Sequence, residues 1–104
     1  MYLVSGPVWK NIYQLSDKQI SDLDSAEELM QLMDINAAEK ILLDMLAEDS
    51  QCVPVLNNLA HMYGRYLSDF EKAVEYYDIV LQIEPDNAWA RDERRRYRRY
   101  IRYD

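Results

Sequence analysis

The feature of this sequence that most constrains its fold is an internal repeat with a period of 35 residues. Asp34 to Ala38 aligns with Asp69 to Ala73. The same register continues through the pairs Leu42/Tyr77, Met45/Val80, Leu46/Leu81, Asp49/Glu84 and Ser50/Pro85. Periods of roughly 20 to 50 residues are typical of stacked-repeat architectures. Such repeats are more often binding scaffolds than catalysts, so we expect a protein that binds a partner.

The spacing of apolar residues predicts an all-α fold. Apolar side chains recur at steps of three and four over residues 18–33, 34–47, 53–63 and 70–83, which is the period of an amphipathic helix. Pro85 should end the fourth helix, because the residue before a proline avoids helical geometry. A fifth helix is expected from Ala88 onward, and Gly64 should loosen the end of the third. Short connections favour antiparallel hairpins.

The ends of these helices also carry recognisable signals. Ser68 or Asp69 can cap the fourth helix, and Asp86 or Asn87 can cap the fifth. Residues 1–17 are expected to form an arm or a short helix after Pro7, and we favour the helix. The predicted organisation is therefore an N-terminal segment 1–17, two repeats over 18–52 and 53–87, and a C-terminal capping helix over 88–104.

Composition excludes several classes of protein. A chain of 104 residues with one cysteine and one histidine offers no disulfide framework, and it argues against a Cys/His metal cluster. No apolar run reaches membrane-spanning length, and the short apolar start is not preceded by the basic region of a signal peptide. No catalytic constellation or Gly-rich phosphate loop is present. We expect a cytoplasmic protein that is not an enzyme and needs no metal or cofactor.

Charge is unevenly distributed along the chain. The net charge is −7, but the segment from Arg91 onward holds seven arginines and three acids, a net charge of +4. The preceding 90 residues hold sixteen acids and five basic residues, a net charge of −11. This asymmetry predicts that the basic segment folds back onto the acidic body or meets an acidic partner.

Residues 53–87 carry a pattern of leucine, small and aromatic residues that ends in a proline. Its members are Leu56, Leu59, Ala60, Tyr63, Ala73, Tyr77 and Pro85. This pattern resembles the tetratricopeptide repeat, a helix-turn-helix unit of about 34 residues. Residues 19–52 resemble a degenerate copy through Ala26, Leu29, Ala38, Leu42 and Ser50, with Ser50 in place of the proline. The second copy has one extra residue between Tyr63 and Ser68, and the first copy lacks the first-helix aromatic.

The resemblance implies a concave groove lined by the first helix of each pair, where a partner segment binds. It places Asn57, Asn58, His61 and Arg65 on that face, at helical intervals opposite the apolar stripe. Amide, imidazole and guanidinium groups can bond a peptide backbone and pair with a carboxylate. The alternative is an ordinary solvated face. A clamp for the C-terminal carboxylate of heat-shock chaperones is disfavoured, because Asp92 and Glu93 occupy the next groove helix.

The arginine- and tyrosine-rich C-terminal helix is a second candidate interface, through Trp89, Arg95, Arg96, Arg99 and Tyr100. The alternative is a capping helix in which Tyr97 and Ile101 pack against Tyr77 and Val80. Arginines interleaved with aromatics also suit nucleic acid, but the acidic body opposes phosphate. Tyr2, Trp9 and Tyr13 could cover one end of the stack or mediate a dimer.

We therefore expect a small adaptor or co-chaperone that holds a protein segment, an acidic one among the candidates, in its groove. The alternative is a subunit of a stable complex or homo-oligomer that assembles through the C-terminal helix. Nucleic-acid binding ranks third, and no membrane contact is expected.

Overall fold

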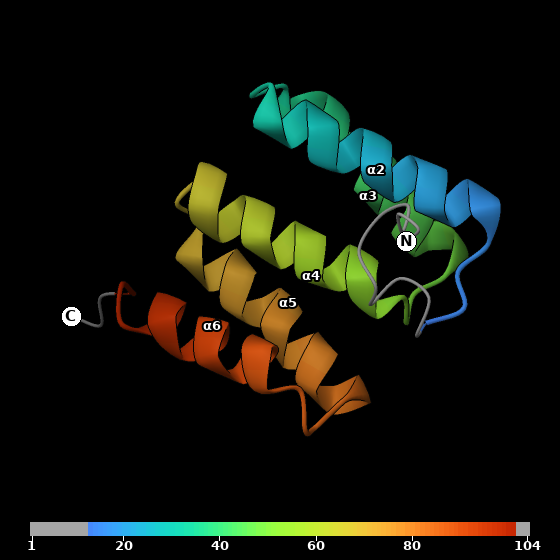
Figure 1. Cartoon of the computed structure of the whole chain (residues 1–104). Coiled ribbons are helices and arrows are strands. Elements are labelled where there is room, and N and C mark those ends of the chain that lie inside the picture. The colour runs from blue at the N-terminus through green and yellow to red at the C-terminus, as the bar shows by residue number, and fades with distance from the viewer. Residues whose placement is uncertain (1–12, 102–104) are drawn as a thin grey trace, which may run out of the picture.

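The predicted stack of helical hairpins is confirmed by a computed structural model, which describes residues 13–101 (Figure 1). Within that range there is no strand, and the helices are α2 (Asp17–Gln31), α3 (Ile35–Glu48), α4 (Val53–His61), the π-helical segment η1 (Met62–Tyr66), α5 (Phe70–Ile83) and α6 (Ala88–Arg98). α2 pairs with α3 and α4 pairs with α5. α6 packs on α5 at the opposite end of the stack from α2. The helix expected after Pro7 lies outside the described residues.

The sequence repeat recurs as a repeat of backbone geometry. α3 and α5 each contain 14 residues, and their N-caps Asp34 and Asp69 accept hydrogen bonds from the backbone N–H three residues on, at 3.4 and 3.2 Å. The residues before these caps, Met33 and Ser68, both adopt left-handed φ values, 65° and 53°. The two loops therefore turn the chain in the same way.

The remaining helix ends follow the residues that border them. α2 begins with a capping box, in which Ser16 and Gln19 bond each other's backbone N–H. Of the two candidates for each later cap, Asp69 and Asn87 are the ones that accept the capping hydrogen bonds. α5 ends at Ile83, two residues before Pro85, as predicted.

Small residues let the helices approach closely. Ala26, Ala38, Ala60, Ala73 and Ala90 are all fully buried, and the first four are positions that carry the family resemblance. Larger side chains fill the space beside them, chiefly Leu23, Leu42, Leu56, Leu59, Tyr77 and Val80. A close-packed core of this kind tolerates little change in side-chain volume.

The extra residue of the second repeat is accommodated by η1. Leu67 N–H bonds the carbonyl oxygen of Met62 at 3.3 Å, an i→i+5 bond that lets the helix absorb one residue more per turn. Our expectation that Gly64 loosens this end is wrong, because the helix continues and Gly64 is buried. Its lack of a side chain makes room for Tyr97, whose Cζ would lie 2.5 Å from a Cβ at position 64.

α6 closes the far end of the stack with aromatic contacts. The ring of Tyr97 is 5% exposed and lies nearly parallel to Phe70 and Tyr77, with centroids 5.9 and 6.2 Å apart. The prediction that Tyr97 packs on Tyr77 is therefore confirmed. Ile101, predicted beside it, is half-buried.

Candidate functional site

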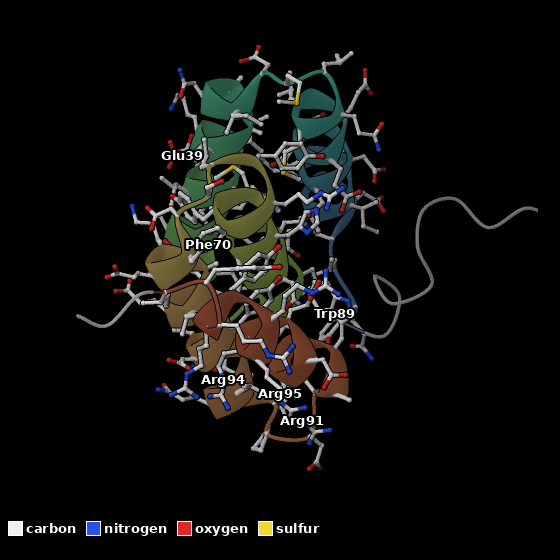
Figure 2. All side chains as sticks on the ribbon, turned by 90° about the vertical axis from the view of Figure 1, so that its left-hand side faces the viewer. Glu39, Phe70, Trp89, Arg91, Arg94 and Arg95 are labelled. Carbon is white, nitrogen blue, oxygen red and sulfur yellow. The ribbon has the colours of Figure 1, made fainter. Side chains whose placement is uncertain are left out.

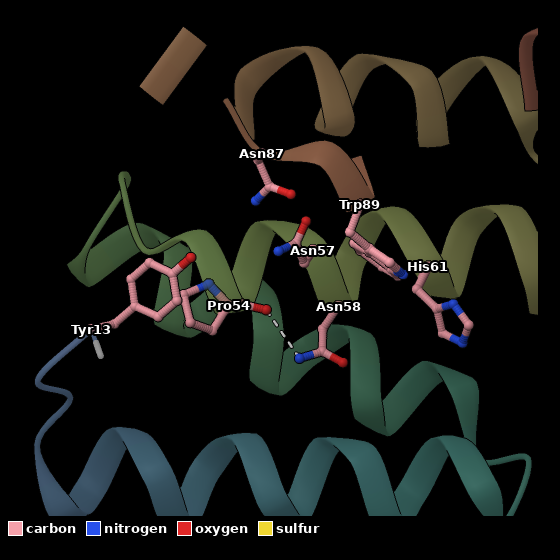
Figure 3. Close-up of a pocket in the computed structure, with 7 residues that line it drawn as sticks. All are labelled: Tyr13, Pro54, Asn57, Asn58, His61, Asn87 and Trp89. Atoms are coloured by element: carbon pink, nitrogen blue, oxygen red, sulfur yellow. Dashed lines mark hydrogen bonds between the residues drawn. The ribbon is translucent and has the colours of Figure 1, made fainter. Parts of the chain in front are cut away.

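A pocket of about 480 Å³ opens along α4, between α2 and the start of α6 (Figure 3). α4 contributes Pro54, Asn57, Asn58 and His61. Asn87 and Trp89 lie across from them at the start of α6, and Tyr13 closes one side. The part of the wall that residues 13–101 contribute is thus made of amides, aromatic rings and one proline, without a lysine or an arginine.

Three of the four residues predicted to face the groove line this pocket, namely Asn57, Asn58 and His61. Arg65 does not, and its side chain is exposed. It lies in η1, where a turn closed by an i→i+5 bond advances each residue by a smaller angle than an α-turn. Arg65 therefore leaves the stripe that α4 presents to the pocket.

Asn58 joins α4 to α2. Its Nδ2 donates to the backbone carbonyl of Pro54 at 3.0 Å and to Glu27 Oε2 at 3.2 Å. A carboxamide has two N–H donors, so both are used within the fold. What Asn58 can offer a ligand is its carbonyl oxygen.

Asn57 carries a polar atom that the fold leaves unsatisfied. Its Oδ1 is buried, and no residue in the described part of the chain donates a hydrogen bond to it. Buried acceptors are nearly always satisfied, and leaving one unpaired costs about 1–3 kcal/mol. Because Oδ1 has almost no accessible surface, an N–H group in the pocket would satisfy it only after the Asn57 side chain rotates toward the pocket.

Tyr13, Glu84 and Asn87 form a hydrogen-bonded cluster at one end of the pocket. The Tyr13 hydroxyl and Asn87 Nδ2 both donate to Glu84 Oε1, each at 3.0 Å. Burial first, and then the bond to Glu84, raises the pKa of Tyr13 to about 12. The phenol is therefore neutral at physiological pH and holds the Glu84 carboxylate at the end of the pocket.

His61 is the titratable group of the wall. Burial lowers the pKa of its imidazole, with a smaller contribution in the same direction from Arg65, while Glu93 acts against them. Its ring meets Tyr66 edge-on, with centroids 5.9 Å apart. His61 is thus largely neutral at pH 7 and can both donate and accept a hydrogen bond.

Trp89 supplies the apolar wall. Its indole is 48% exposed, and it contacts Tyr77 edge-on at a centroid distance of 5.7 Å. One part of the ring is thereby fixed against the core while the rest remains available to a ligand. A fixed, half-exposed aromatic side chain loses little conformational entropy on binding.

The other residues of the second predicted interface differ in their surroundings. Arg96 Nε pairs with Glu93 at 3.3 Å, and the Tyr100 ring rests on Phe70 at 5.0 Å while staying 56% exposed. Arg95 and Arg99 are exposed. Trp89 belongs to the pocket and not to this surface, so the five residues do not form one patch.

Sequence reasoning missed Tyr13, Pro54 and Asn87 as lining residues. The sequence marks Asn87 only as a candidate helix cap, and Pro54 and Asn87 both lie at the end of the pocket because α4 and α6 start there. Tyr13 contacts Glu84 across 71 residues of sequence, a distance that no local pattern can signal.

We also searched the described residues for metal-binding groups and membrane-spanning helices, and compared the chain with known proteins. Over residues 13–101 no group of three His, Cys, Asp or Glu side chains could hold a metal ion. No helix there is long and apolar enough to cross a membrane. Comparisons with protein-family models, with curated proteins and with solved structures find no match.

Proposed function

We propose that this chain is a tetratricopeptide-like adaptor that binds an extended segment of another protein in the pocket along α4. The observation that carries the proposal is the unsatisfied Asn57 Oδ1 in a wall that also holds His61 and the half-exposed Trp89. Backbone N–H and C=O groups of an extended peptide match such donors and acceptors. The resemblance of residues 53–87 to the repeat family supports the same face.

The composition of the wall supports a neutral part of the partner inside the pocket. An apolar side chain would contact Trp89 and Pro54, while the peptide backbone would meet Asn57 and His61. Inside the pocket, an acidic residue of the segment would meet the carboxylates of Glu84, at one end, and Glu27, beside Asn58. Its positive partner would be Arg65, which lies outside the pocket. We therefore place any acidic residue of the partner in the flank of the segment, outside the pocket.

A random-peptide phage library panned on the intact protein tests this proposal. An enriched peptide is then synthesised and titrated by calorimetry against wild type and against Asn57→Ala/His61→Ala. We expect the double substitution to weaken binding at least about tenfold, the loss expected for two hydrogen bonds of about 1 kcal/mol each.

The matched control is Asn36→Ala/Lys40→Ala, which truncates two exposed side chains on α3 far from the pocket. It should leave affinity within about twofold, since neither side chain lies in the pocket wall. Equal affinities of wild type and the pocket variant would disprove the proposal.

A further inference from the structure

The two ends of the stack carry opposite charge. Residues 17–48, which include α2 and α3, hold nine carboxylates and two lysines, a net charge of −7. α6 holds five arginines and two carboxylates, a net charge of +3. Figures 1 and 2 show these segments at opposite ends of the molecule, with Arg91, Arg94 and Arg95 spread along α6.

The arginines of α6 occupy the face on which a further helix would pack. Shifting the sequence by one 35-residue repeat aligns Arg91, Arg94, Arg95 and Arg98 with Leu56, Leu59, Ala60 and Tyr63 of the second repeat. In the second repeat all four of those positions are buried in the core of the stack. In α6 the same face ends the stack and is basic. We call these four arginines the basic end.

Most of the basic end is free to meet a partner. Arg94 pairs with Asp78 of α5 at 2.8 Å. Arg91, Arg95 and Arg98 are exposed, and none of them pairs with a carboxylate of residues 13–101. Three unpaired guanidinium groups on one helical face favour a surface that presents several carboxylates.

Such a surface lies at the other end of the same molecule. A hollow of about 240 Å³ between α2 and α3 is lined by Lys18, Asp22, Ile41, Asp44, Met45 and Glu48. Glu27 accepts a hydrogen bond from Asn58 of α4 and Glu39 accepts one from Tyr63 of η1, so both mark the inner flanks of α2 and α3. The residues of the hollow lie on the flanks away from α4, at the outer end of the stack. We call Asp22, Asp44 and Glu48 the acidic end.

The acidic end keeps a net charge of −1 when its two paired lysines are counted, because Lys18 pairs with Asp22 and Lys40 pairs with Asp44 at 3.1 Å. Lys18 Nζ bonds Asp22 at 2.8 Å, and this bond, followed by the charges of Glu48 and Asp44, raises the pKa of Lys18. Ile41 and Met45 provide an apolar floor that the aliphatic stems of arginines can cover. The hollow thus offers carboxylates to the guanidinium groups of the basic end and an apolar floor to their aliphatic stems.

We propose that the basic end of one copy docks on the acidic end of a second copy, head to tail. The two surfaces differ, so the contact is heterologous and continues the stack from one molecule to the next. An interface made mainly of exposed charges is weak and sensitive to salt. Assembly should therefore be a property of low ionic strength and high protein concentration.

Sedimentation velocity of the intact protein tests the salt dependence. At about 10 mM NaCl, where the screening length is about 30 Å, we expect species larger than a dimer that grow with concentration. At about 1 M NaCl, where that length is about 3 Å, we expect monomer. A wild-type chain that stays monomeric at low salt, including one that instead binds a single-stranded DNA oligonucleotide, would overturn the proposal.

Two variants test the geometry. The basic-end variant carries Arg91→Gln, Arg95→Gln and Arg98→Gln, and the acidic-end variant carries Asp22→Asn, Asp44→Asn and Glu48→Gln. Each should be monomeric alone, because each lacks one of the two surfaces. An equimolar mixture should form a heterodimer and nothing larger, because one competent surface remains on each partner.

Three controls test whether assembly depends on the charges of the two named ends and not on charge elsewhere or on loss of folding. Neutralising Glu71, Glu75 and Asp86, three exposed carboxylates outside both ends, should leave assembly as in wild type. Replacing the three arginines by lysine should preserve assembly, and circular dichroism should show every variant folded. The proposal fails if the acidic-end variant assembles alone like wild type, or if the mixture stays monomeric.

Discussion

At the scale of the residue, Gly64 and Tyr97 determine how closely α6 can approach η1. Gly64 lies in a helical segment, where alanine would ordinarily be more stable by about 0.5–1 kcal/mol. Here a Cβ would meet three atoms of the Tyr97 ring at 2.5–2.8 Å. We predict that Gly64→Ala destabilises the fold by about 1–3 kcal/mol in urea denaturation, as overpacking does.

A double-mutant cycle checks the cause of this loss. In a Tyr97→Ala background the ring is absent, so Gly64→Ala should be neutral or stabilising. Equal destabilisation in both backgrounds would show that the ring of Tyr97 is not what requires glycine at position 64.

His61 should make stability depend on pH in a predictable direction. Its pKa is lowered in the fold, chiefly by burial, with Arg65 adding to the effect and Glu93 opposing it. The neutral form is therefore favoured by folding. This contribution is present above the ordinary pKa of about 6.5 and is lost as pH falls through the folded-state value.

Replacing His61 by glutamine should remove that part of the pH dependence. Between pH about 6.5 and about 5.5, we expect wild type to lose more unfolding free energy than His61→Gln. Urea denaturation at both pH values measures the difference. Parallel losses in the two proteins would show that His61 is not perturbed by burial.

At the scale of the element, the repeated loops before α3 and α5 depend on their aspartate caps. Asp69 Oδ1 accepts the N–H of Lys72 at 3.2 Å and satisfies one of the free donors of α5. We predict that Asp69→Ala lowers the unfolding free energy by about 1 kcal/mol. Ser25→Ala, an exposed substitution within α2, is the control and should change it by less than about 0.5 kcal/mol.

The helices were predictable because their information is local. Apolar periodicity, Asp34 and Asp69 as caps, and Pro85 as a terminator all act within a few residues. η1 was not predictable, because an extra residue between Tyr63 and Ser68 indicates an insertion but not whether a loop or a helical turn absorbs it. Only the packing of Tyr97 over Gly64 favours the helical turn.

The candidate site was predictable only in part, because only some of its residues are placed by local signals. Asn57, Asn58 and His61 share one face of α4, which follows from helical spacing and the family resemblance. Tyr13 reaches the pocket through a contact between distant segments, and Arg65 leaves it because of η1. Tertiary packing, and not local pattern, decides both.

At the scale of the whole molecule, α6 is part of the core as well as its cover. It buries Tyr77, which is fully inaccessible, and packs Tyr97 and Tyr100 on Phe70. Burying one large aromatic or aliphatic side chain contributes about 1.5–3 kcal/mol. We predict that a chain ending at Asp86 loses about 3 kcal/mol or more of unfolding free energy.

Thermal and urea denaturation measure this loss, with Arg95→Ala as a control that keeps α6 and removes one exposed side chain. The control should change the unfolding free energy by less than about 0.5 kcal/mol. If the truncated chain unfolds at the same urea concentration as wild type, α6 is not part of the cooperative unit.

The central claim is that a peptide binds along α4, and amide chemical-shift mapping with a library-selected peptide tests it most directly. The account predicts that shifts concentrate at Asn57, Asn58, His61 and the Trp89 indole N–H, while Asp44 and Glu48 at the outer end stay unchanged. Shifts confined to α6 or to the outer flanks of α2 and α3, with the pocket residues unmoved, would contradict it.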